Sequence, residues 1–422
     1  MLVLGILSLP LVYYIGRKLR GRDFGLLAMF LLAISPWHIA ISRRAHETDL
    51  LPFLFLLGFA CLLKTDVTNH WFVLACLVLG VGLYSYWTSY LIIPLFILIA
   101  IPSLYAASRV TLKDLVVGIL LLMVLATPVA LYMIINSLEL PSIHLGLITI
   151  PRFPSVSRIN TEVVVFQPAP FQHFLQSAVG FSGMIIMQIS GSSNSTSIGY
   201  PYGYLYRFTF PLTLAGAVIF FRNTKDAIAR RMLLAWLVAT AVLGLMISPL
   251  FGHNNVLIPA LILLCAASLE YLWAWNKAVL VLSLAVFLAA FALFMGYSQG
   301  TEYRDLAQRE YYEGLLPALN YASSSTTGPI CVDNTKIIQP EIFVMFSEKA
   351  APSVGPDKIV YADPSSQFRQ ARSVGRYFFG SENCSPGVPV TYVLTARESP
   401  PGSGRAFTTR MFEGFFKVLV PR

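Results

Sequence analysis

The first 296 residues alternate between long apolar runs and short polar turns. Most runs approach the roughly 20 apolar residues that an α-helix needs to cross a bilayer. The pattern predicts about ten transmembrane helices, with a long interruption over residues 137–206 after the sixth. The expected helices cover residues 1–16, 24–42, 50–64, 71–87, 89–107, 115–136, 207–221, 232–250, 256–273 and 278–296.

The interruption at residues 137–206 contains several prolines and the polar tract SGSSNSTSIGYPYGY. Loops of this length are usually functional or disordered. Within it, residues 171–189 predict an amphipathic helix that lies in the membrane interface instead of crossing it.

Lysine and arginine concentrate in every second polar turn. Because cytoplasmic loops carry an excess of these residues, the bias orients the chain with residues 137–206 and 297–422 outside the cytoplasm. We expect the plasma membrane as the location. The predicted inner turns hold twelve basic residues, Arg17, Lys18, Arg20, Arg22, Lys64, Arg109, Lys113, Arg222, Lys225, Arg230, Arg231 and Lys277. The outer turns before residue 297 hold five, Arg43, Arg44, Arg152, Arg158 and Arg207.

Composition agrees with a membrane protein. Hydrophobic residues make up 56% of the chain, charged residues 12%, and the mean hydropathy is +0.67. A soluble chain carries about 25% charged residues. The net charge of +9 falls in turns between apolar runs, without the interleaved aromatic and basic residues of a nucleic-acid surface. We therefore expect membrane lipids as partners and no nucleic acid.

Residues 297–422 differ in character and predict an extracytoplasmic α/β domain, separate from a transmembrane domain at 1–296. The domain shows no glycine-rich phosphate loop or nucleophile elbow, which favours a binding or scaffolding role. Its expected elements are a helix at 302–324, strands at 329–333, 358–361, 389–395 and 415–420, and a helix at 338–349.

The five cysteines divide by region. Cys61, Cys76 and Cys265 lie in apolar runs and are expected to be buried. Cys331 and Cys384 lie in the C-terminal domain and could form a disulfide if that domain is outside the cytoplasm. The sequence gives no distance between them, so this pairing stays open. No cysteine spacing resembles a metal knuckle.

A polar corner separates the second and third apolar runs. Ionisable side chains beside two spans are costly in lipid, so they must face water, a cavity or a ligand. Arginine suits a phosphate, and a carboxylate could take a proton or hold a divalent cation, a candidate cofactor. Two alternatives are a solvated loop and an ion pair of Arg43 with Glu47, four residues on, worth a few tenths of a kcal/mol. The corner contains His38, Arg43, Arg44, His46, Glu47 and Asp49.

The orientation brings three polar segments to the same membrane face: residues 42–49, 137–206 and 252–255. Arginines, carboxylates and interface aromatics at one face suit an enzyme whose substrate is a sugar on a membrane lipid. The predicted substrate-binding residues are Arg43, His46, Glu47, Asp49, Tyr86, Tyr90, His253 and Asn254. No resident metal site is predicted.

The stretch RKLRGRDFGLLAMFLLAISPWHIAISRRAHETDLLPFLFLLG at 17–58 resembles the GT-C membrane glycosyltransferases. It is most similar to glycosyltransferase family 39, which is related to protein O-mannosyltransferases and lipid A aminoarabinose transferases. Arg43 matches the motif arginine, Glu47 the motif carboxylate, and Asp49 stands where members often have asparagine. Residues 82–96, 206–216 and 313–322 also resemble family segments.

The resemblance implies transfer of a sugar from a polyprenyl phosphate to a protein, lipid or glycan acceptor outside the cytoplasm. The family's catalytic acidic residue lies in a first outer loop that would precede Met1. We therefore expect an N-terminally truncated chain without its general base, whose catalytic residue is unknown and whose activity is impaired. The chain also has Gly252, His253 and Asn254 where the family often has an arginine.

Two other functions stay open. A lipid or sugar transporter would need inverted repeats or charges at mid-span, whereas the charges here sit at span ends. A non-catalytic membrane scaffold that presents residues 297–422 would need no general base.

Overall fold

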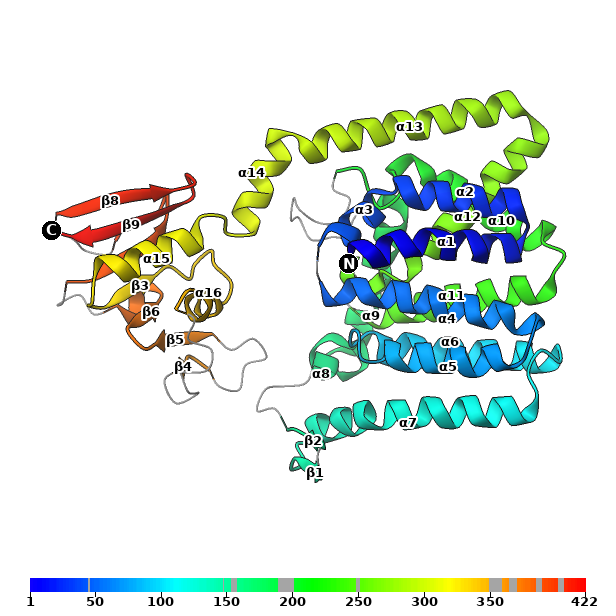
Figure 1. The fold of residues 1–422 in the computed structure, drawn as a ribbon, viewed down its shortest axis with the longest axis horizontal. Coiled ribbons are helices and arrows are strands. Elements are labelled where there is room, and N and C mark those ends of the chain that lie inside the picture. The colour runs from blue at the N-terminus through cyan, green and yellow to red at the C-terminus, as the bar shows by residue number, and fades with distance from the viewer. Residues whose placement is uncertain are drawn as a thin grey trace. The chain divides into compact units, whose positions relative to one another are not determined.

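The computed structural model describes the chain except for residues 45, 147, 153–157, 189–200, 248–250, 349–358, 364–369, 385–388 and 401–405. The described chain forms two compact units, a helical unit within residues 1–299 and a C-terminal unit within 300–422. Figure 1 shows the mostly helical first unit and the strands and helices of the second.

Each predicted apolar run forms helix over most of its described length, as Figure 1 shows for the helical unit. Among the described residues, seven helices are individually long and apolar enough to cross a membrane, and α2 with α3 forms a further candidate span bent by 60°. The helices are α1 (Leu2–Leu19), α2 (Arg22–Ile34), α3 (Pro36–Arg43), α4 (Leu50–Leu63), α5 (His70–Gly82), α6 (Ser89–Ala106), α7 (Leu112–Ser137), α10 (Phe210–Asn223), α11 (Ala227–Met246), α12 (Leu257–Trp275) and α13 (Lys277–Gln299).

Helix α5 is clearly shorter than its predicted span, with 13 residues, and it stops at Gly82. The prediction of one helix over residues 71–87 is therefore wrong at its C-terminal end. Residues 83–88 form successive turns instead, and the Ser85 hydroxyl donates to the Gly82 carbonyl at 2.6 Å. A serine that bonds the preceding turn competes with the helical hydrogen bond.

The core of the helical unit is aromatic and tightly packed. The ring centroid of Trp236 on α11 lies 5.1 Å from that of Phe55 and 4.9 Å from that of Phe59, both on α4. Helix α12 crosses α10 so closely that a Cβ on Gly216 would lie 1.8 Å from the Leu264 carbonyl oxygen. Only glycine fits at that crossing. In contrast, α7 and α13 expose most of their apolar surface, as expected for helices that face lipid.

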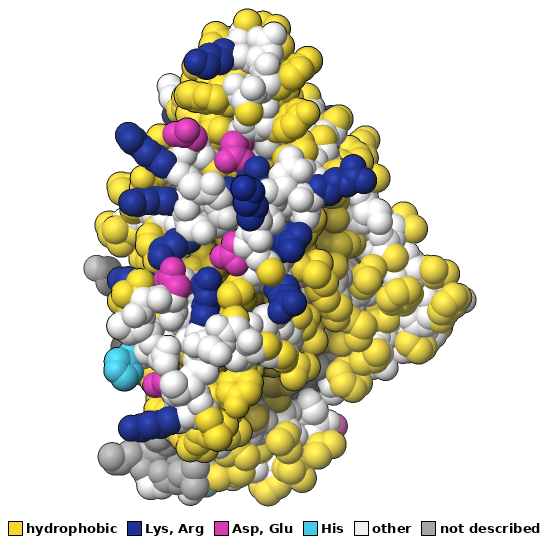
Figure 2. Space-filling view, turned by 90° about the vertical axis from the view of Figure 1, so that its right-hand side faces the viewer, with side chains coloured by type: hydrophobic (Ala, Val, Ile, Leu, Met, Phe, Trp, Pro, Cys, Tyr) yellow, Lys and Arg dark blue, Asp and Glu magenta, His cyan; other side chains and the backbone are white. Residues whose placement is uncertain are grey.

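Ion pairs join the alternate turns at one end of the helical unit, here called the basic end (residues 17–22, 64–70, 107–113, 222–231 and 275–277). Arg20 contacts Glu270 of α12 at 2.6 Å and the Thr224 hydroxyl at 2.8 Å. Lys18 pairs with Asp66 at 2.8 Å. Figure 2 shows Lys and Arg side chains gathered on this end with carboxylates between them. The turns that hold the twelve predicted inner basic residues thus lie together.

The interruption contains short elements within its described residues. They are the hairpin β1 (Ile143–Leu145) and β2 (Ile148–Ile150), α8 (Arg158–Glu162), the 3-10 turn η3 (Val164–Phe166) and α9 (Pro170–Met187).

Helix α9 confirms the predicted helix at 171–189. It packs against α11, where a Cβ on Gly244 would lie 2.3 Å from the Phe181 ring. Its exposed face carries Phe171 and Val179, which are 71% and 74% exposed. Its position in the membrane interface stays a prediction. Most of the serine-rich tract lies outside the described residues.

The C-terminal unit is an α/β structure built on a seven-stranded sheet. The strand order is β4-β5-β6-β3-β7-β9-β8, and β3 runs parallel to β6 and β7. The predicted helix at 302–324 is wrong in its middle, because the chain breaks around Gly314, where φ is +90°. The elements are α14 (Thr301–Glu310), α15 (Leu315–Ser325), β3 (Ile330–Val332), α16 (Pro340–Ser347), β4 (Ile359–Tyr361), β5 (Ala371–Val374), β6 (Tyr377–Phe379), β7 (Thr391–Thr395), β8 (Phe407–Phe412) and β9 (Phe416–Pro421).

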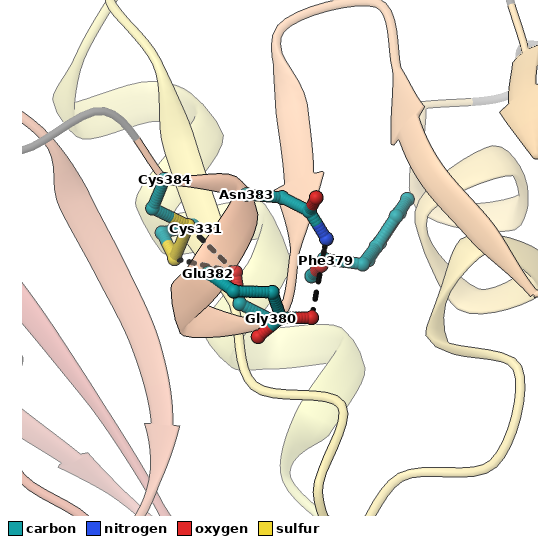
Figure 3. The surroundings of a disulfide bond; sticks show 6 residues. All are labelled: Cys331, Phe379, Gly380, Glu382, Asn383 and Cys384. Carbon is teal, nitrogen blue, oxygen red and sulfur yellow. Dashed lines mark hydrogen bonds between the residues drawn. A yellow bond between two sulfur atoms is a disulfide. The ribbon is translucent and has the colours of Figure 1, made fainter. Parts of the chain in front are cut away.

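Both faces of the sheet are largely buried at its central strands β3, β7 and β9, with alternate residues on each face. Val332, Val393 and Val418 join α15 and α16 in one apolar cluster. On the other face, Cys331 and Cys384 form a disulfide (Figure 3). The bridge spans 53 residues, and a loop of that length stabilises a fold by about 4 kcal/mol in the chain-entropy model. Cys61, Cys76 and Cys265 are buried and unbridged, as predicted.

Candidate functional site

The polar corner begins where helix α2 breaks. Proline cannot donate the next helical hydrogen bond, so Pro36 opens a new helix, with Ser35 as its cap. The Ser35 hydroxyl accepts from the backbone of His38 at 3.3 Å and donates to the Tyr204 carbonyl at 2.6 Å. The 60° bend turns α3 away from the axis of α2 and carries Arg43 to its last turn.

Asp49 is the buried centre of the corner, and its partner is Arg44. Its carboxylate accepts from the Arg44 guanidinium at 2.9 and 3.1 Å and from the Thr48 hydroxyl at 3.1 Å. The Asp49 side chain is 0% exposed and that of Arg44 29%. Asn255 adds an amide donor at 3.4 Å and is itself held by the Trp37 indole at 3.0 Å. The bidentate ion pair between Arg44 and Asp49 fixes the connection between α3 and α4.

Arg43 and Glu47 lie on the exposed side of the corner. The side chains of His46 and Glu47 are 51% and 57% exposed, and His46 Nδ1 lies 3.7 Å from a Glu47 oxygen. Among the described residues no ion pair joins Arg43 to Glu47. The helix-end pair considered from the sequence is thus wrong, because α3 ends at Arg43 and Glu47 begins the 3-10 turn η1 (Glu47–Asp49). Helical four-residue spacing does not apply across that boundary.

An aromatic wall stands beside the corner. The His253 ring centroid lies 5.9 Å from that of Tyr86 and 5.2 Å from that of Trp87, and all three side chains are at most 9% exposed. Asn254 is also buried, whereas Tyr90 is partly exposed on α6. His253 and Asn254 belong to the 3-10 turn η5 (Phe251–Asn254), which contacts η1.

The long interruption reaches the same end, here called the loop end (the described residues within 35–49, 83–88, 137–209 and 247–256). The Tyr206 hydroxyl donates to the Ile34 carbonyl at 2.7 Å. Val163 pairs with Ile247 in an isolated bridge. The three polar segments predicted to share one face therefore meet in the structure.

A narrow, mostly apolar cleft opens between α1, α3 and α4. His38 and Asp49 are among its lining residues, and His38 Nε2 lies 3.1 Å from the Gly5 carbonyl oxygen. Gly5 permits the approach of α1 to α3, since a Cβ there would lie 2.1 Å from the Ser42 hydroxyl. Among the residues that the structure describes, no three His, Cys, Asp or Glu side chains converge as metal ligands.

Residues 1–149 match the family model described as dolichyl-phosphate-mannose-protein mannosyltransferase. The crystal structure of ArnT from Cupriavidus metallidurans bound to undecaprenyl phosphate is similar, with a TM-score of 0.53 and 14% identity, over 99% of this chain and 82% of ArnT. The chain therefore has the fold of that structure, the GT-C fold. The predicted fold class is thus confirmed.

A second similar structure is the oligosaccharyltransferase AglB from Archaeoglobus fulgidus in complex with an inhibitory peptide and a dolichol-phosphate. Its TM-score is 0.46 and its identity 13%, over 82% of this chain and 52% of AglB. The chain thus spans about half the length of that protein. No curated protein sequence matches the chain.

Sequence reasoning placed Arg44 in the corner without predicting its partner, and it missed three further residues that hold the corner. Arg44 and Asn255 bind Asp49, while Tyr204 and Tyr206 tie the interruption to the α2–α3 break. The dipeptide Ser35–Pro36 was an available signal for the break, since a capping residue before proline marks a helix start. The tyrosine contacts depend on segments far apart in the chain and left no local signal.

Proposed function

We propose that this protein is a membrane glycosyltransferase that moves a sugar from a polyprenyl phosphate to a protein, lipid or glycan acceptor at the loop end. The observation that carries the proposal is the family-model match over residues 1–149, which contains the whole corner from Ser35 to Asp49. The likeness to a structure that holds undecaprenyl phosphate supports the lipid donor.

Arg43 binds the donor phosphate in this proposal. Its guanidinium can donate two parallel hydrogen bonds to paired phosphate oxygens. The guanidinium of its neighbour Arg44 already donates two hydrogen bonds to Asp49. No ion pair engages Arg43 within the described part of the chain, so its fork faces outward from a corner that the Arg44–Asp49 pair holds rigid.

Other residues at the loop end contact the sugar and the acceptor. Glu47 and His46 are exposed and can bond sugar hydroxyls. Tyr86, His253 and Asn254 form the wall behind them, and Tyr90 continues it along α6. Asp49 acts on the substrate through Arg44 and the corner backbone, since its side chain is fully buried.

The loop end and the C-terminal unit lie outside the cytoplasm in this proposal, and the membrane is the plasma membrane. The cluster of Lys and Arg at the basic end supports that orientation (Figure 2). The Cys331–Cys384 disulfide supports it independently, because disulfides persist in oxidising compartments.

The test is donor turnover by the purified chain in lipid vesicles, with labelled polyprenyl-phosphate pentoses and hexoses and release of the polyprenyl phosphate as readout. Arg43→Lys keeps the charge but loses the fork. A hydrogen bond to a charged group is worth about 1.5–3 kcal/mol, so turnover at subsaturating donor should fall about 10- to 100-fold.

The matched control is Arg152→Lys, an arginine of the same end that pairs with exposed Glu139. It should turn over donor as the parent does. Unchanged turnover by Arg43→Ala would make that arginine an interface anchor. A parent chain that neither turns over nor binds any labelled donor would refute the transferase.

A further inference from the structure

The C-terminal unit contains a cavity of about 350 Å³ that the transfer reaction does not require. It lies at the carboxyl ends of the parallel strands β3 and β7, where the loops at 333–338 and 395–398 begin. Ligands of α/β structures bind preferentially at this edge of a parallel sheet. The residues that give it chemical character are Arg309, Tyr312, Lys336, Thr395, Arg397 and Phe415.

The cavity is cationic. Its described lining includes Arg309, Lys336 and Arg397 but no carboxylate. Lys336 pairs with Glu398 at 3.1 Å, outside the lining. Neither arginine forms an ion pair with another described residue, so the site carries a net positive charge. Lys417 adds a further ammonium at the wall, where it donates to the Ala396 carbonyl at 3.0 Å. This charge selects an anionic ligand.

The remaining lining combines aromatic faces with an unsatisfied hydroxyl. The Arg309 guanidinium lies 5.4 Å from the centroid of the Phe415 ring, so cation and aromatic face stand side by side. Thr395 Oγ1 is buried with no hydrogen-bond partner among the described residues. A buried polar atom costs free energy unless something bonds it. Aromatic faces, a hydroxyl and cations together suit a sugar ring that carries an acidic group.

The cavity walls are fixed without a ligand. The Tyr312 hydroxyl accepts from the Ile338 backbone at 3.0 Å. The Ala396 backbone donates to the Phe415 carbonyl at 2.7 Å. The β8–β9 hairpin turns through Glu413 and Gly414, both with positive φ, and the Phe415 N–H donates back to the Phe412 carbonyl at 3.1 Å. The volume is also within the roughly 300–1,000 Å³ of small-molecule pockets.

We propose that this cavity binds a saccharide that bears a carboxylate or a phosphate ester. The aromatic side chains contact the ring, Thr395 bonds a hydroxyl, and the two arginines and Lys336 bind the acidic group. The site belongs to the C-terminal unit alone and holds whether or not the helical unit transfers a sugar.

Calorimetric titration of the full chain in detergent, at low salt, tests the proposal with four probes: glucuronate, glucose 6-phosphate, glucose and inorganic phosphate. We expect glucuronate or glucose 6-phosphate to bind about tenfold more tightly than both glucose and phosphate. The first two arms distinguish a carboxylate from a phosphate ester as the acidic group.

Arg397→Ala and Phe415→Leu should each weaken that binding about five- to twentyfold, through loss of a charged hydrogen bond or of the ring contact. The matched control is Arg372→Ala, an exposed arginine of β5 outside the cavity, which should leave binding unchanged. If Arg397→Ala disturbs folding, Lys336→Met tests the same charge from another loop.

Equal affinity for glucose would overturn the anion preference, and equal affinity for phosphate would overturn the saccharide. Failure of both anionic sugars to bind, or equal weakening by Arg372→Ala, would overturn the site. Donor turnover by the helical unit is read separately, so either proposal can fail alone.

Discussion

Asp49→Asn tests whether the Arg44–Asp49 pair holds the corner between α3 and α4. The substitution keeps the size of the side chain but replaces one oxygen with an NH₂ group. Arg44 presents two donors at 2.9 and 3.1 Å, and one of them would then face another donor. The guanidinium also loses its counter-charge. We expect the corner to open more often, although the helices around it stay formed.

The magnitude follows from burial. Removing one partner of a buried ion pair costs about 3–5 kcal/mol. Asp49 is fully buried, but the Arg44 side chain is 29% exposed and can regain water when unpaired. We therefore expect a loss of about 2–3 kcal/mol, or a roughly 30- to 150-fold rise in the open population. Hydrogen exchange of the backbone amides at 46–50, followed by mass spectrometry, measures this directly.

The matched control is Glu139→Gln, which removes the same charge from a carboxylate 2.9 Å from Arg152. That carboxylate is 78% exposed, and exposed pairs contribute about 0–1 kcal/mol. Exchange should therefore change little there. Adding Arg44→Gln to Asp49→Asn should restore part of the protection, because two amides can bond each other. If Asp49→Asn exchanged no faster at 46–50 than the parent, the pair would not be what fixes the corner.

Three further outcomes are expected. Gly216→Ala should lower the melting temperature of the purified chain, because the new methyl group would lie 1.8 Å from the Leu264 carbonyl oxygen. The control Gly296→Ala on α13 has open space around the new methyl group and should leave the melting temperature unchanged. Equal effects of the two substitutions would contradict the close crossing of α10 and α12. A membrane-impermeant thiol reagent applied from outside the cell should label Ser324→Cys and miss Lys225→Cys at the basic end, and the reverse would refute the orientation. Hydrogen bonds from the Tyr377 hydroxyl and then the Ser323 hydroxyl hold the pKa of Glu348 below its usual 4.5, so the stability that Glu348 contributes is full above that value and is lost as the pH falls through the folded-state pKa. The melting temperature of Glu348→Gln should therefore fall less steeply below about pH 4.5 than that of the parent. Parallel curves for the two proteins would count against these bonds.

Continuous apolar runs determined most of the helical unit. The predicted spans at 89–107 and 256–273 correspond to Ser89–Ala106 and Leu257–Trp275, because hydrophobicity alone limits where a buried helix can end. The same holds for the C-terminal sheet. Residues 389–395 and 415–420 formed β7 and β9 as predicted, while β5, β6 and β8 were missed; β5 and β8 contain an arginine and have no continuous apolar run.

The candidate site was less predictable, for a physical reason. The sequence pairs Arg43 with Glu47 only if both belong to one helix. In the structure that helix ends at Arg43, and the ion pair of the corner forms between Arg44 and Asp49 instead. Asn255 then completes the pair from about 200 residues away, at 3.4 Å. Pattern reasoning places such residues on one face of the membrane, but their contacts depend on where the helix stops.

The break at Ser35 also explains why the long interruption belongs to the site. In an unbroken helix the Ile34 carbonyl would accept from the His38 N–H, but that donor bonds the Ser35 hydroxyl instead. The freed carbonyl is satisfied by the Tyr206 hydroxyl at 2.7 Å, and Ser35 in turn donates to Tyr204. A helix kink at this point therefore requires the end of the interruption to be in place. The orientation of α3, and with it the direction in which Arg43 faces, is coupled through these buried bonds to the segment that separates the first helices of the fold from the last.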